Sequence, residues 1–299
     1  MQYGALRGLR SAPHVIVVGS GKGGSGKTTL AMHVAIGLLR AGQRVGTLDL
    51  DADQCGLTRY VEAREQWAHH RHIDLELPQH SQIPEASGTR TDEIEALEVE
   101  WLQQAVERVE SSCDFLVIDT PSHDSYLTRV VHLIADTILT PLRDSFLDLC
   151  ALGLIDPLTQ EVTRTGYYAT AVGAARKRRR QLDPAFVDWV VIVNGAYDPP
   201  LVTPRLAELA MRLGFRDVGG CAERAVYRRL FPLGLTAFDA PDEITLATCQ
   251  GDSQLAQQEM RALMDRLQLP VDDRGVRRAA ARAEWLRCKD KPLLLEEII

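Results

Sequence analysis

A glycine-rich loop between an apolar run and a helical segment constrains this chain more than any other feature. Residues 15–18 are Val-Ile-Val-Val, and residues 19–29 are Gly-Ser-Gly-Lys-Gly-Gly-Ser-Gly-Lys-Thr-Thr. Residues 21–28 fit the P-loop pattern, in which two glycines flank four free positions before Lys and Thr. Glycines let the backbone curl around phosphate oxygens, and the positive end of the following helix attracts the same charge. The sequence therefore predicts nucleotide binding by Gly21, Lys22, Gly23, Gly24, Ser25, Gly26, Lys27, Thr28 and Thr29.

Two lysines and one hydroxyl of this loop have different expected roles. Lys27 is expected to reach the β- and γ-phosphates, and the Thr28 hydroxyl is expected to ligate Mg²⁺. Lys22 is a second lysine within an already complete loop, and holding one nucleotide does not require it. From the pattern alone, Lys22 is explained as a solvated loop residue.

Two predicted strands end in carboxylates close to this loop. Residues 44–51 form a strand that ends in Asp49 and Asp51, which strand alternation would place on the same side. One of the two could hold a metal-bound water while the other orients the water that attacks the γ-phosphate. Residues 113–119 form a second strand, and Asp119 at its end would hold a Mg²⁺-bound water. Taken singly, each carboxylate is also explained as an acidic turn or a capping residue.

The alternation of apolar runs with helical patterns indicates an α/β protein. We expect a surface loop over 81–92, a helix over 93–110, and further strands at 137–140 and 189–193. This order implies a mainly parallel sheet with helices on both faces, and a nucleotide beyond the carboxyl ends of the strands. Asn194, which follows the last of these strands, would lie at the rim where a base could bind.

Composition limits the class of protein further. The 299 residues are 45% hydrophobic, which is ample for one large core, so we expect an N-terminal tail (1–13), one domain (14–270) and a C-terminal extension (271–299). The net charge of −7 argues against a strongly basic nucleic-acid binder. Six scattered cysteines without a C-x-x-C pair favour a reduced cytoplasm over a zinc or disulfide framework. The sequence shows neither a secretory signal nor a run long enough to span a bilayer.

Three polar segments have ordinary structural explanations as well as functional ones. The histidines within 62–80 lack acidic or cysteine partners at ligand spacing, which favours a solvated helix and the loop after it over a metal site. The basic run 176–180 could touch phosphates or an acidic partner, but a charged helix end explains it at least as well. A membrane-surface helix in the tail is disfavoured because its apolar face is mostly alanine.

Arginines in and after a predicted helix at 203–213 are candidates for weak, non-specific DNA contact. The helix is expected to begin at Thr203-Pro204, to end at Gly214 and to bury its leucines. A pair between Glu208 and Arg212 would instead support a solvated helix face. The candidates are Arg205, Arg212, Arg216, Arg224, Arg228 and Arg229.

The form Lys-Gly-Gly-x-Gly-Lys-Thr at 22–28 resembles the deviant P-loop, or deviant Walker A motif, of the ParA/MinD ATPases. Residues 15–269 are most similar to the MipZ branch of that superfamily, and 140–148 and 227–236 are especially close. The resemblance implies a SIMIBI-type P-loop NTPase in which ATP closes a sandwich homodimer and slow hydrolysis releases monomers. It assigns Lys22 to the phosphates of the partner subunit. It also assigns Mg²⁺ coordination to Thr28, Asp49 and Asp119, the hydrolytic water to Asp51, and adenine contacts to Asn194 and Pro232.

For MipZ-like proteins, the resemblance also implies a role in positioning the cell-division site. That role involves the chromosome-partitioning protein ParB, non-specific DNA binding by the dimer, and inhibition of polymerisation of the tubulin-like FtsZ, all in the cytoplasm and at the nucleoid. Two departures affect these expectations: Ser122-His123 replace glycines, and Asp198-Pro199-Pro200 shorten an expected arginine-rich stretch. The alternatives are a partitioning or positioning ATPase for another cargo, or a metabolic or assembly ATPase of the same fold.

Overall fold

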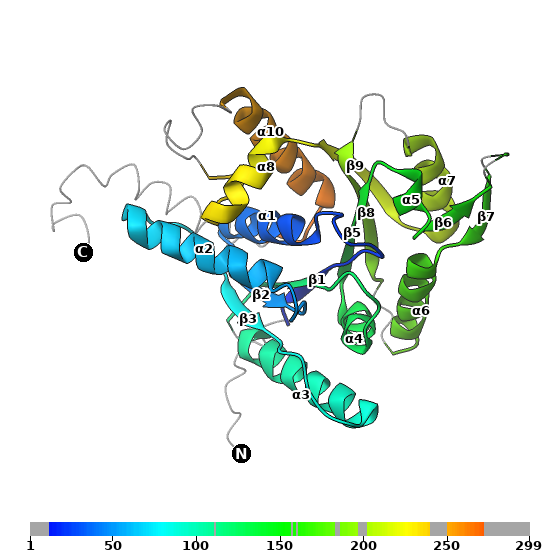
Figure 1. Cartoon of the computed structure of the whole chain (residues 1–299), viewed down its shortest axis with the longest axis horizontal. Helices are drawn as coiled ribbons and strands as arrows, with labels where there is room; N and C mark the ends of the chain where they lie inside the picture. Colours follow the sequence, from blue (N-terminus) through cyan, green and yellow to red (C-terminus); the bar gives the residue numbers. More distant parts are fainter. Residues whose placement is uncertain are drawn as a thin grey trace, which may run out of the picture.

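The computed structural model describes residues 12–110, 112–156, 158–159, 161–182, 186–196, 202–239 and 250–271. In this part of the chain, seven strands form one sheet in the order β3-β2-β4-β1-β5-β8-β9, and every pairing in it is parallel (Figure 1). Its strands are β1 (His14–Val18), β2 (Val45–Asp49), β3 (Gln79–Gln82), β4 (Phe115–Asp119), β5 (Thr137–Arg143), β8 (Asp188–Ala196) and β9 (Arg216–Ala222). The strands β6 (Gly153–Ile155) and β7 (Val162–Thr165) form a separate antiparallel pair.

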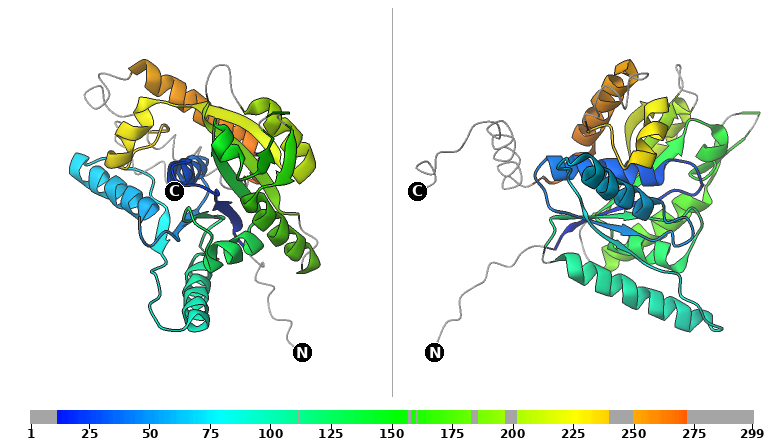
Figure 2. Two further views of the ribbon diagram at one scale, coloured as in Figure 1. Left: turned by 45° about the vertical axis from the view of Figure 1, so that its right-hand side comes forward. Right: turned by 60° about the vertical axis from the view of Figure 1, so that its left-hand side comes forward.

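Helices cover both faces of the sheet (Figure 2). One face carries α1 (Lys27–Arg40), α2 (Gly56–Arg71), α8 (Ala225–Leu230), the short 3₁₀ helix η1 (Phe231–Leu233) and α10 (Gln250–Leu267). The other face carries α3 (Thr91–Glu110), α4 (Tyr126–Ile134), α6 (Tyr167–Leu182) and α7 (Thr203–Leu213). The short helix α5 (Phe146–Leu149) follows β5. None of the described helices has the length and apolar content to cross a bilayer.

The central strands are apolar on both sides because both sides are covered. In β1, Val15 and Val17 belong to the core beneath α3, α4 and α6, whereas Ile16 and Val18 belong to the core beneath α1 and α10. Successive side chains of a strand point to opposite faces, so a strand between two helical layers has an unbroken apolar run. This is the pattern that marks the central strands in the sequence.

Most of the predicted architecture is confirmed. The α/β class, the parallel sheet and the two helical layers are present, and β5, β8 and α3 lie where the sequence predicts them. The loop predicted at 81–92 is wrong at both ends, because β3 extends to Gln82 and α3 begins at Thr91. The predicted domain boundaries stay a prediction. Asp198-Pro199-Pro200 and nearly all of the 271–299 extension lie outside the described residues.

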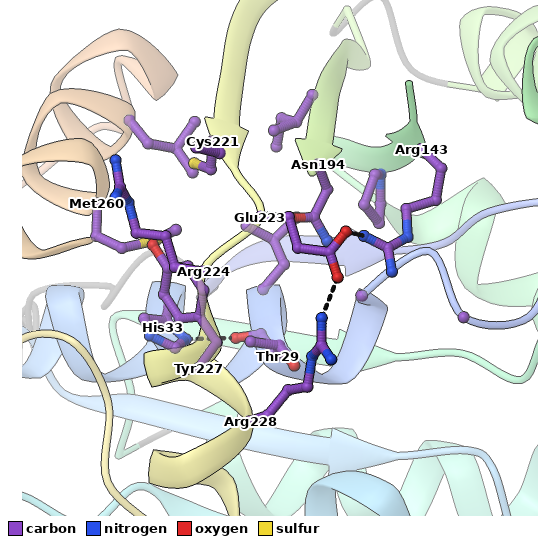
Figure 3. Close-up of a pocket in the computed structure, with 17 residues that line it drawn as sticks. Thr29, His33, Arg143, Asn194, Cys221, Glu223, Arg224, Tyr227, Arg228 and Met260 are labelled. Atoms are coloured by element: carbon purple, nitrogen blue, oxygen red, sulfur yellow. Dashed lines mark hydrogen bonds and ion pairs between the residues drawn. The ribbon is translucent and has the colours of Figure 1, made fainter. Parts of the chain in front are cut away.

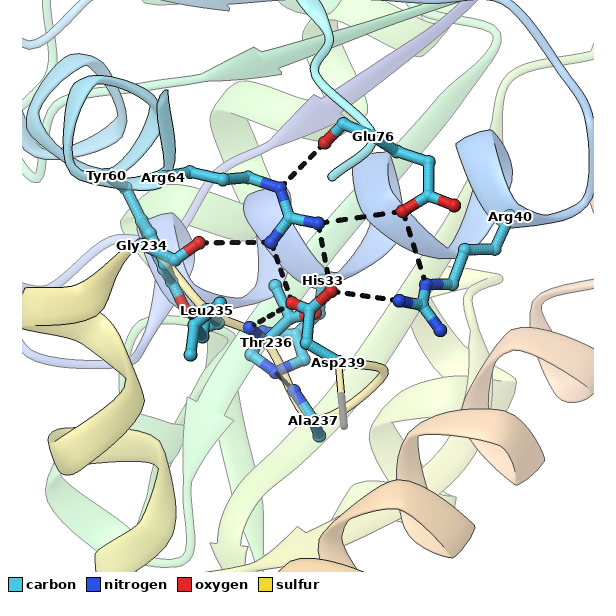
Figure 4. A network of polar contacts seen from close by, with 10 residues as sticks. All are labelled: His33, Arg40, Tyr60, Arg64, Glu76, Gly234, Leu235, Thr236, Ala237 and Asp239. Atoms are coloured by element: carbon cyan, nitrogen blue, oxygen red, sulfur yellow. Dashed lines mark hydrogen bonds and ion pairs between the residues drawn. The ribbon is translucent and has the colours of Figure 1, made fainter. Parts of the chain in front are cut away.

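A buried polar cluster fixes the segment after η1 against α1 and α2 (Figure 4). Arg64 of α2 is fully buried, and its Nη1 and Nη2 donate to Oδ2 and Oδ1 of Asp239 at 2.7 and 2.9 Å. The backbone N–H and the hydroxyl of Thr236 donate to the same carboxylate at 2.7 and 2.8 Å. Within this segment, the N–H of Ala237 donates to Nε2 of His33 in α1. Because each buried charge has its partners, the cluster holds the segment in one position.

Candidate nucleotide-binding site

The glycine-rich loop connects the carboxyl end of β1 to the start of α1. Gly26 precedes α1 with φ of 92°, in the left-handed region, and a Cβ at this position would overlap Nδ2 of Asn194. Backbone conformation and space therefore both require glycine. The same Nδ2 of Asn194, in β8, donates a hydrogen bond to the carbonyl oxygen of Ser25 at 2.8 Å. The loop is thus fastened to a strand that lies two places along the sheet from β1.

Lys27 lies at the start of α1 with its ammonium group inside the loop. Its Nζ is 3.4 Å from the hydroxyl of Ser20 and 3.4 Å from the carbonyl oxygen of Lys22. Burial lowers the pKa of Lys27, and the carboxylates of Asp119 and Asp51 oppose that shift. A phosphate at this ammonium would favour its charged form, so the geometry suits the expected contact with a nucleotide.

Thr28 and Asp119 form a compact set of oxygen atoms beside the loop. The Thr28 hydroxyl donates to Asp119 Oδ2 at 2.6 Å. Asp119 ends β4 in a buried position, and among the described residues its Oδ1 has no hydrogen-bond partner. Burial, assisted by the charges of Asp49 and Asp51, raises the pKa of Asp119 to about 7. A hydroxyl beside an unpartnered buried carboxylate oxygen is the hard donor set that Mg²⁺ prefers, so these residues fit the ion.

Asp49 and Asp51 lie in different surroundings, and strand alternation does not relate them. The strand β2 ends at Asp49, so Asp51 belongs to the loop that leads to α2. Asp49 is fully buried; its Oδ1 accepts from the N–H of Asp51, and its Oδ2 accepts from the N–H and hydroxyl of Thr58. Asp51 is half-buried, and its Oδ1 accepts from the N–H of Gln54. Asp49 therefore fastens the start of α2, a role that the sequence analysis did not foresee.

Lys22 is held by an acidic residue of the same chain. Its Nζ lies 2.6 Å from Oδ1 of Asp148 in α5, and the side chains are 44% and 4% exposed. The aromatic ring of Tyr167, at the start of α6, lies against Gly21 on the same side of the loop. The Lys22 ammonium is thus directed toward α5, whereas the Lys22 carbonyl oxygen faces the ammonium of Lys27.

A cavity of about 250 Å³ opens on the other side of the loop, between α1, β8, β9, α8 and α10 (Figure 3). The ring of Tyr227 packs edge-on against His33 with centroids 5.4 Å apart, and its hydroxyl is buried with no hydrogen-bond partner in the described part of the chain. A largely apolar hollow with a few polar groups beside a phosphate site suits a nucleoside base. Its lining includes Thr29, Leu30, His33, Asn194, Cys221, Tyr227 and Met260.

The structure brings only one of the two expected base contacts to this cavity. Asn194 lines it, whereas Pro232 lies exposed in η1, which packs on α2. Pro232 therefore does not line this cavity, and its expected contact with adenine stays a prediction. Tyr227 occupies the place expected of it, five residues earlier in the same segment. The segment 227–236 was the available signal, although its apolar residues are equally typical of a core.

Two of the arginines expected at a DNA surface have their guanidinium groups engaged in ion pairs within the chain. Arg216 donates to both oxygens of Asp188 and so links β9 to β8. Arg224 donates to both oxygens of Glu259 at 3.0 and 2.6 Å and to Asp252, which links it to α10. These ion pairs remove Arg216 and Arg224 from the candidates, because DNA would have to displace well-aligned carboxylates.

The remaining candidates are Arg205 and Arg212 in α7 and Arg228 and Arg229 in α8. Arg212 donates to the carbonyl oxygen of Val162, while Glu208 pairs with Arg205 at 3.6 Å, so the expected Glu208–Arg212 pair is wrong. The helix that carries them is α7, and Gly214 ends it in the left-handed conformation as predicted. Arg228 and Arg229 are exposed on α8, where Arg228 pairs with Glu223.

Comparison with known sequences identifies the family. The sequence profile of the ATPase MipZ matches residues 14–271. This chain belongs to the MipZ family of ATPases. Maintenance of carboxysome distribution protein A of Halothiobacillus neapolitanus is 28% identical over 238 residues, which cover 77% of this chain and 92% of that protein. The cytosolic Fe-S cluster assembly factor nubp2 of Xenopus tropicalis is 39% identical over 61 residues, so the match spans 20% of this chain and only 23% of that relative's length.

Solved structures confirm the fold. A plasmid partition protein of Borrelia burgdorferi B31, bound to AMPPNP, aligns with a TM-score of 0.54 at 15% identity, covering 85% of this chain and 98% of that one. The septum site-determining protein MinD of Pyrococcus horikoshii OT3, complexed with Mg-ADP, aligns with a TM-score of 0.54 at 14% identity, covering 86% and 96%. At such identities the likeness concerns the fold alone.

Proposed function

We propose that this chain is an ATP-dependent dimerising switch, built on one domain over 14–270, in which slow hydrolysis separates the two copies. The observation that carries the proposal is the position of Lys22. In the proposed site, Lys27 already supplies a phosphate contact. Lys22 lies on the same loop, is 44% exposed and is held by Asp148. An exchangeable cation at the rim of a phosphate site is suited to binding the phosphates of a second copy.

The surroundings of Lys22 suit contact with a second copy of the chain. Three large apolar side chains are exposed there: Phe146 at 44%, Leu147 at 70% and Tyr167 at 61%. Phe146 and Leu147 directly precede Asp148 in α5, and Tyr167 lies against the loop at Gly21. Exposed apolar residues gathered beside a functional loop are typical of a protein interface. We propose that closure on ATP buries them while Lys22 exchanges Asp148 for a phosphate.

Within each copy, we propose the following division of roles. The Lys27 ammonium holds the β- and γ-phosphates, and Thr28 and Asp119 hold Mg²⁺, which neutralises charge on the phosphate oxygens. Asp49 acts on the site indirectly, because its oxygens already accept hydrogen bonds from Asp51 and Thr58 and hold these residues in place. Asp51 orients the attacking water, and the hollow lined by Asn194 and Tyr227 takes the adenine.

We further propose that the positioned structure is the cell-division site. In this account, the ATP-bound dimer inhibits polymerisation of an FtsZ-like protein, and a ParB-like protein recruits it to the chromosome in the cytoplasm. Membership of the MipZ family supports this role. The carboxysome distribution relative makes positioning of another cargo the second candidate. The match to an Fe–S assembly factor covers only 20% of this chain, which disfavours an assembly role.

DNA contact in this account is weak, non-specific and limited to the ATP-bound dimer. Arg205, Arg212, Arg228 and Arg229 are the remaining candidates, and one copy offers few phosphate contacts against a net charge of −7. Two such faces in a dimer raise the apparent affinity through effective concentration. Each phosphate contact should contribute close to one unit to the slope of log affinity against log salt.

The proposed role is tested by sedimentation of FtsZ polymers in the presence of this protein and ATP. We expect wild-type protein with ATP to reduce the pelleted FtsZ, and the Lys22→Ala variant or ADP to leave it unchanged. Lys177→Ala, an exposed lysine on α6, is the matched control and should behave as wild type. Polymer levels unaffected by an ATP-bound wild-type dimer would reject the division-site role and favour the second candidate.

A further inference from the structure

The edge strand β3 carries a histidine that bridges two other elements. In the parallel pairing of β2 with β3, His80 lies opposite Thr47. Its Nδ1 is 3.0 Å from the hydroxyl of Thr47, and its Nε2 is 3.0 Å from the hydroxyl of Thr58 in the first turn of α2. His80 therefore connects the edge of the sheet to the N-terminus of α2.

The direction of each hydrogen bond follows from the chemistry of the acceptors. The Thr58 hydroxyl lies 2.9 Å from Asp49 Oδ2, and a carboxylate only accepts, so the single hydroxyl hydrogen goes to Asp49. The Thr58 oxygen must then accept from Nε2–H of His80. In the neutral ring Nδ1 carries no proton, so it accepts in turn from the Thr47 hydroxyl. Thr47, His80, Thr58 and Asp49 thus form one chain with all donors pointing toward Asp49, in which each bond reinforces the next.

This chain of hydrogen bonds ends at the residue that fastens the acidic loop, residues 50–55. Asp49 accepts from the N–H of Asp51 at 3.0 Å and from the N–H of Thr58 at 2.9 Å, so it holds both ends of the loop. A Cβ on Gly56 would lie 3.1 Å from the Thr28 hydroxyl, so the start of α2 also packs against the proposed Mg²⁺ site. A shift of Thr58 would therefore reach Asp51 and Thr28 together.

We propose that His80 is a positioning residue for ATP hydrolysis, which acts through Thr58 and Asp49 to hold Asp51 in place for the attacking water. The inference rests on the proposed ATPase activity and deepens it. His80 itself does not line the nucleotide cavity. Burial lowers its pKa, against the opposing charges of Asp49 and Glu62, which agrees with a neutral ring that donates from Nε2 only.

Two conservative substitutions separate the two bonds of His80. In His80→Gln, the side-chain amide reaches the place of Nε2 and can donate to Thr58. In His80→Asn, the shorter side chain reaches only the place of Nδ1 and its bond with Thr47. We expect His80→Asn and His80→Leu to lower kcat about 10-fold with KM for ATP unchanged within about twofold, and His80→Gln to keep most of the wild-type rate.

Thr58→Val removes the hydroxyl and keeps the N–H that Asp49 accepts. It should lower kcat as much as His80→Asn, and combining the two should cause no further loss, because both break the same link. Equal rates for the Gln and Asn variants, or additive losses in the double variant, would overturn the proposal. Melting temperatures of all variants identify any that fail to fold.

A second measurement does not depend on turnover. In protein labelled with ¹⁵N-histidine, the His80 ring, assigned by its loss in His80→Gln, should be the tautomer protonated at Nε2. Protonation at Nδ1 would overturn the inference even in an active protein. Conversely, a wild-type protein that shows this tautomer but no ATP turnover would reject the proposed function and not the hydrogen-bond chain.

Discussion

The phosphate end of the site and the cavity beside it are built in different ways. At the phosphate end, one loop and the ends of two parallel strands supply Lys27, Thr28 and Asp119 within a short distance of one another. In the cavity, side chains converge from α1, β8, β9, α8 and α10, including Asn194 and Tyr227. The first is set by the backbone of a parallel sheet, and the second by the packing of helices that are distant in sequence.

This difference determines how each part should respond to substitution. Phosphate binding concentrates charge on a few groups that have no substitute, so losing one should abolish a function. Base binding spreads weaker contacts over many side chains, so losing one should weaken binding without abolishing it. The predictions below test this contrast from the largest expected effect to the smallest.

Lys27→Ala should weaken ATP binding most. The buried ammonium supplies a charge-assisted contact that nothing else in the loop replaces, so we expect at least about a 100-fold loss of affinity, or about 2.7 kcal/mol. Titration with a fluorescent ATP analogue measures the loss. Lys22→Ala, on the same loop, is the matched control and should bind ATP to the monomer normally. A loss under about fivefold in Lys27→Ala would contradict the assignment of the phosphate end.

Asp51→Ala should separate turnover from binding. Without the water-orienting carboxylate, we expect kcat to fall about 100-fold while ATP affinity stays within about threefold, because Lys27 and the loop backbone carry binding. Steady-state phosphate release and nucleotide titration measure the two quantities. Asp53→Ala, an exposed aspartate in the same loop, is the control and should stay near wild type. Turnover unchanged within about threefold in Asp51→Ala would reject the role.

His33, on the cavity wall, should make the folded protein sensitive to acid. The fully buried ring has its pKa lowered to about 4, with burial the main cause, so the unfolded chain binds more protons between about pH 4 and 6.5. The free energy of unfolding is therefore unaffected by His33 above about pH 6.5. On acidification toward pH 4 it falls by at most about 1.4 kcal/mol per pH unit for one histidine.

The buried His132 of α4 has its pKa lowered to about 4 in the same way and should contribute equally. Urea titrations at pH 7, 6 and 5 should therefore show a smaller pH dependence of stability in His33→Gln than in wild type. His69→Gln, an exposed histidine of α2, is the control and should keep it all. A pH dependence in His33→Gln identical to that of wild type would contradict the neutral buried ring.

Tyr227→Phe should have the smallest effect. The buried hydroxyl lacks a partner in the described residues, so its removal should leave the melting temperature of the nucleotide-free protein unchanged or raise it. If adenine is its partner, ATP affinity should fall about fivefold, or about 1 kcal/mol. An affinity for ATP equal to that of wild type would show that the base binds without this hydroxyl.

The same contrast explains what the sequence could predict. The P-loop, the strand ending in Asp119 and the parallel sheet follow from local patterns with a fixed geometric meaning. Asn194 could be predicted because it directly follows the apolar run 190–193. The position of Pro232 was not, since it depends on how η1 packs against α2 in the folded chain. The short strand β3 was missed because Gln-His-Ser-Gln has no apolar period.

Side-chain pairing was the least predictable property. Arginines such as Arg216 and Arg224 are typical of nucleic-acid contacts. In the folded chain, however, Arg216 pairs with Asp188, and Arg224 pairs with Asp252 and Glu259. Likewise, the two bonds that Asp49 accepts from Thr58 depend on where α2 begins, which the sequence does not mark with a capping residue. Such pairings join segments far apart in sequence and are set by tertiary packing.

The central claim is that Lys22 acts across the interface between two ATP-bound copies. Sizing chromatography with light scattering, in the presence of Mg²⁺ and a non-hydrolysable ATP analogue, tests it most directly. The account predicts a dimer for wild type and a monomer for Lys22→Ala, although nucleotide titration shows that both bind the analogue. A normal dimer peak for Lys22→Ala would contradict the account and leave Lys22 as a loop lysine paired with Asp148.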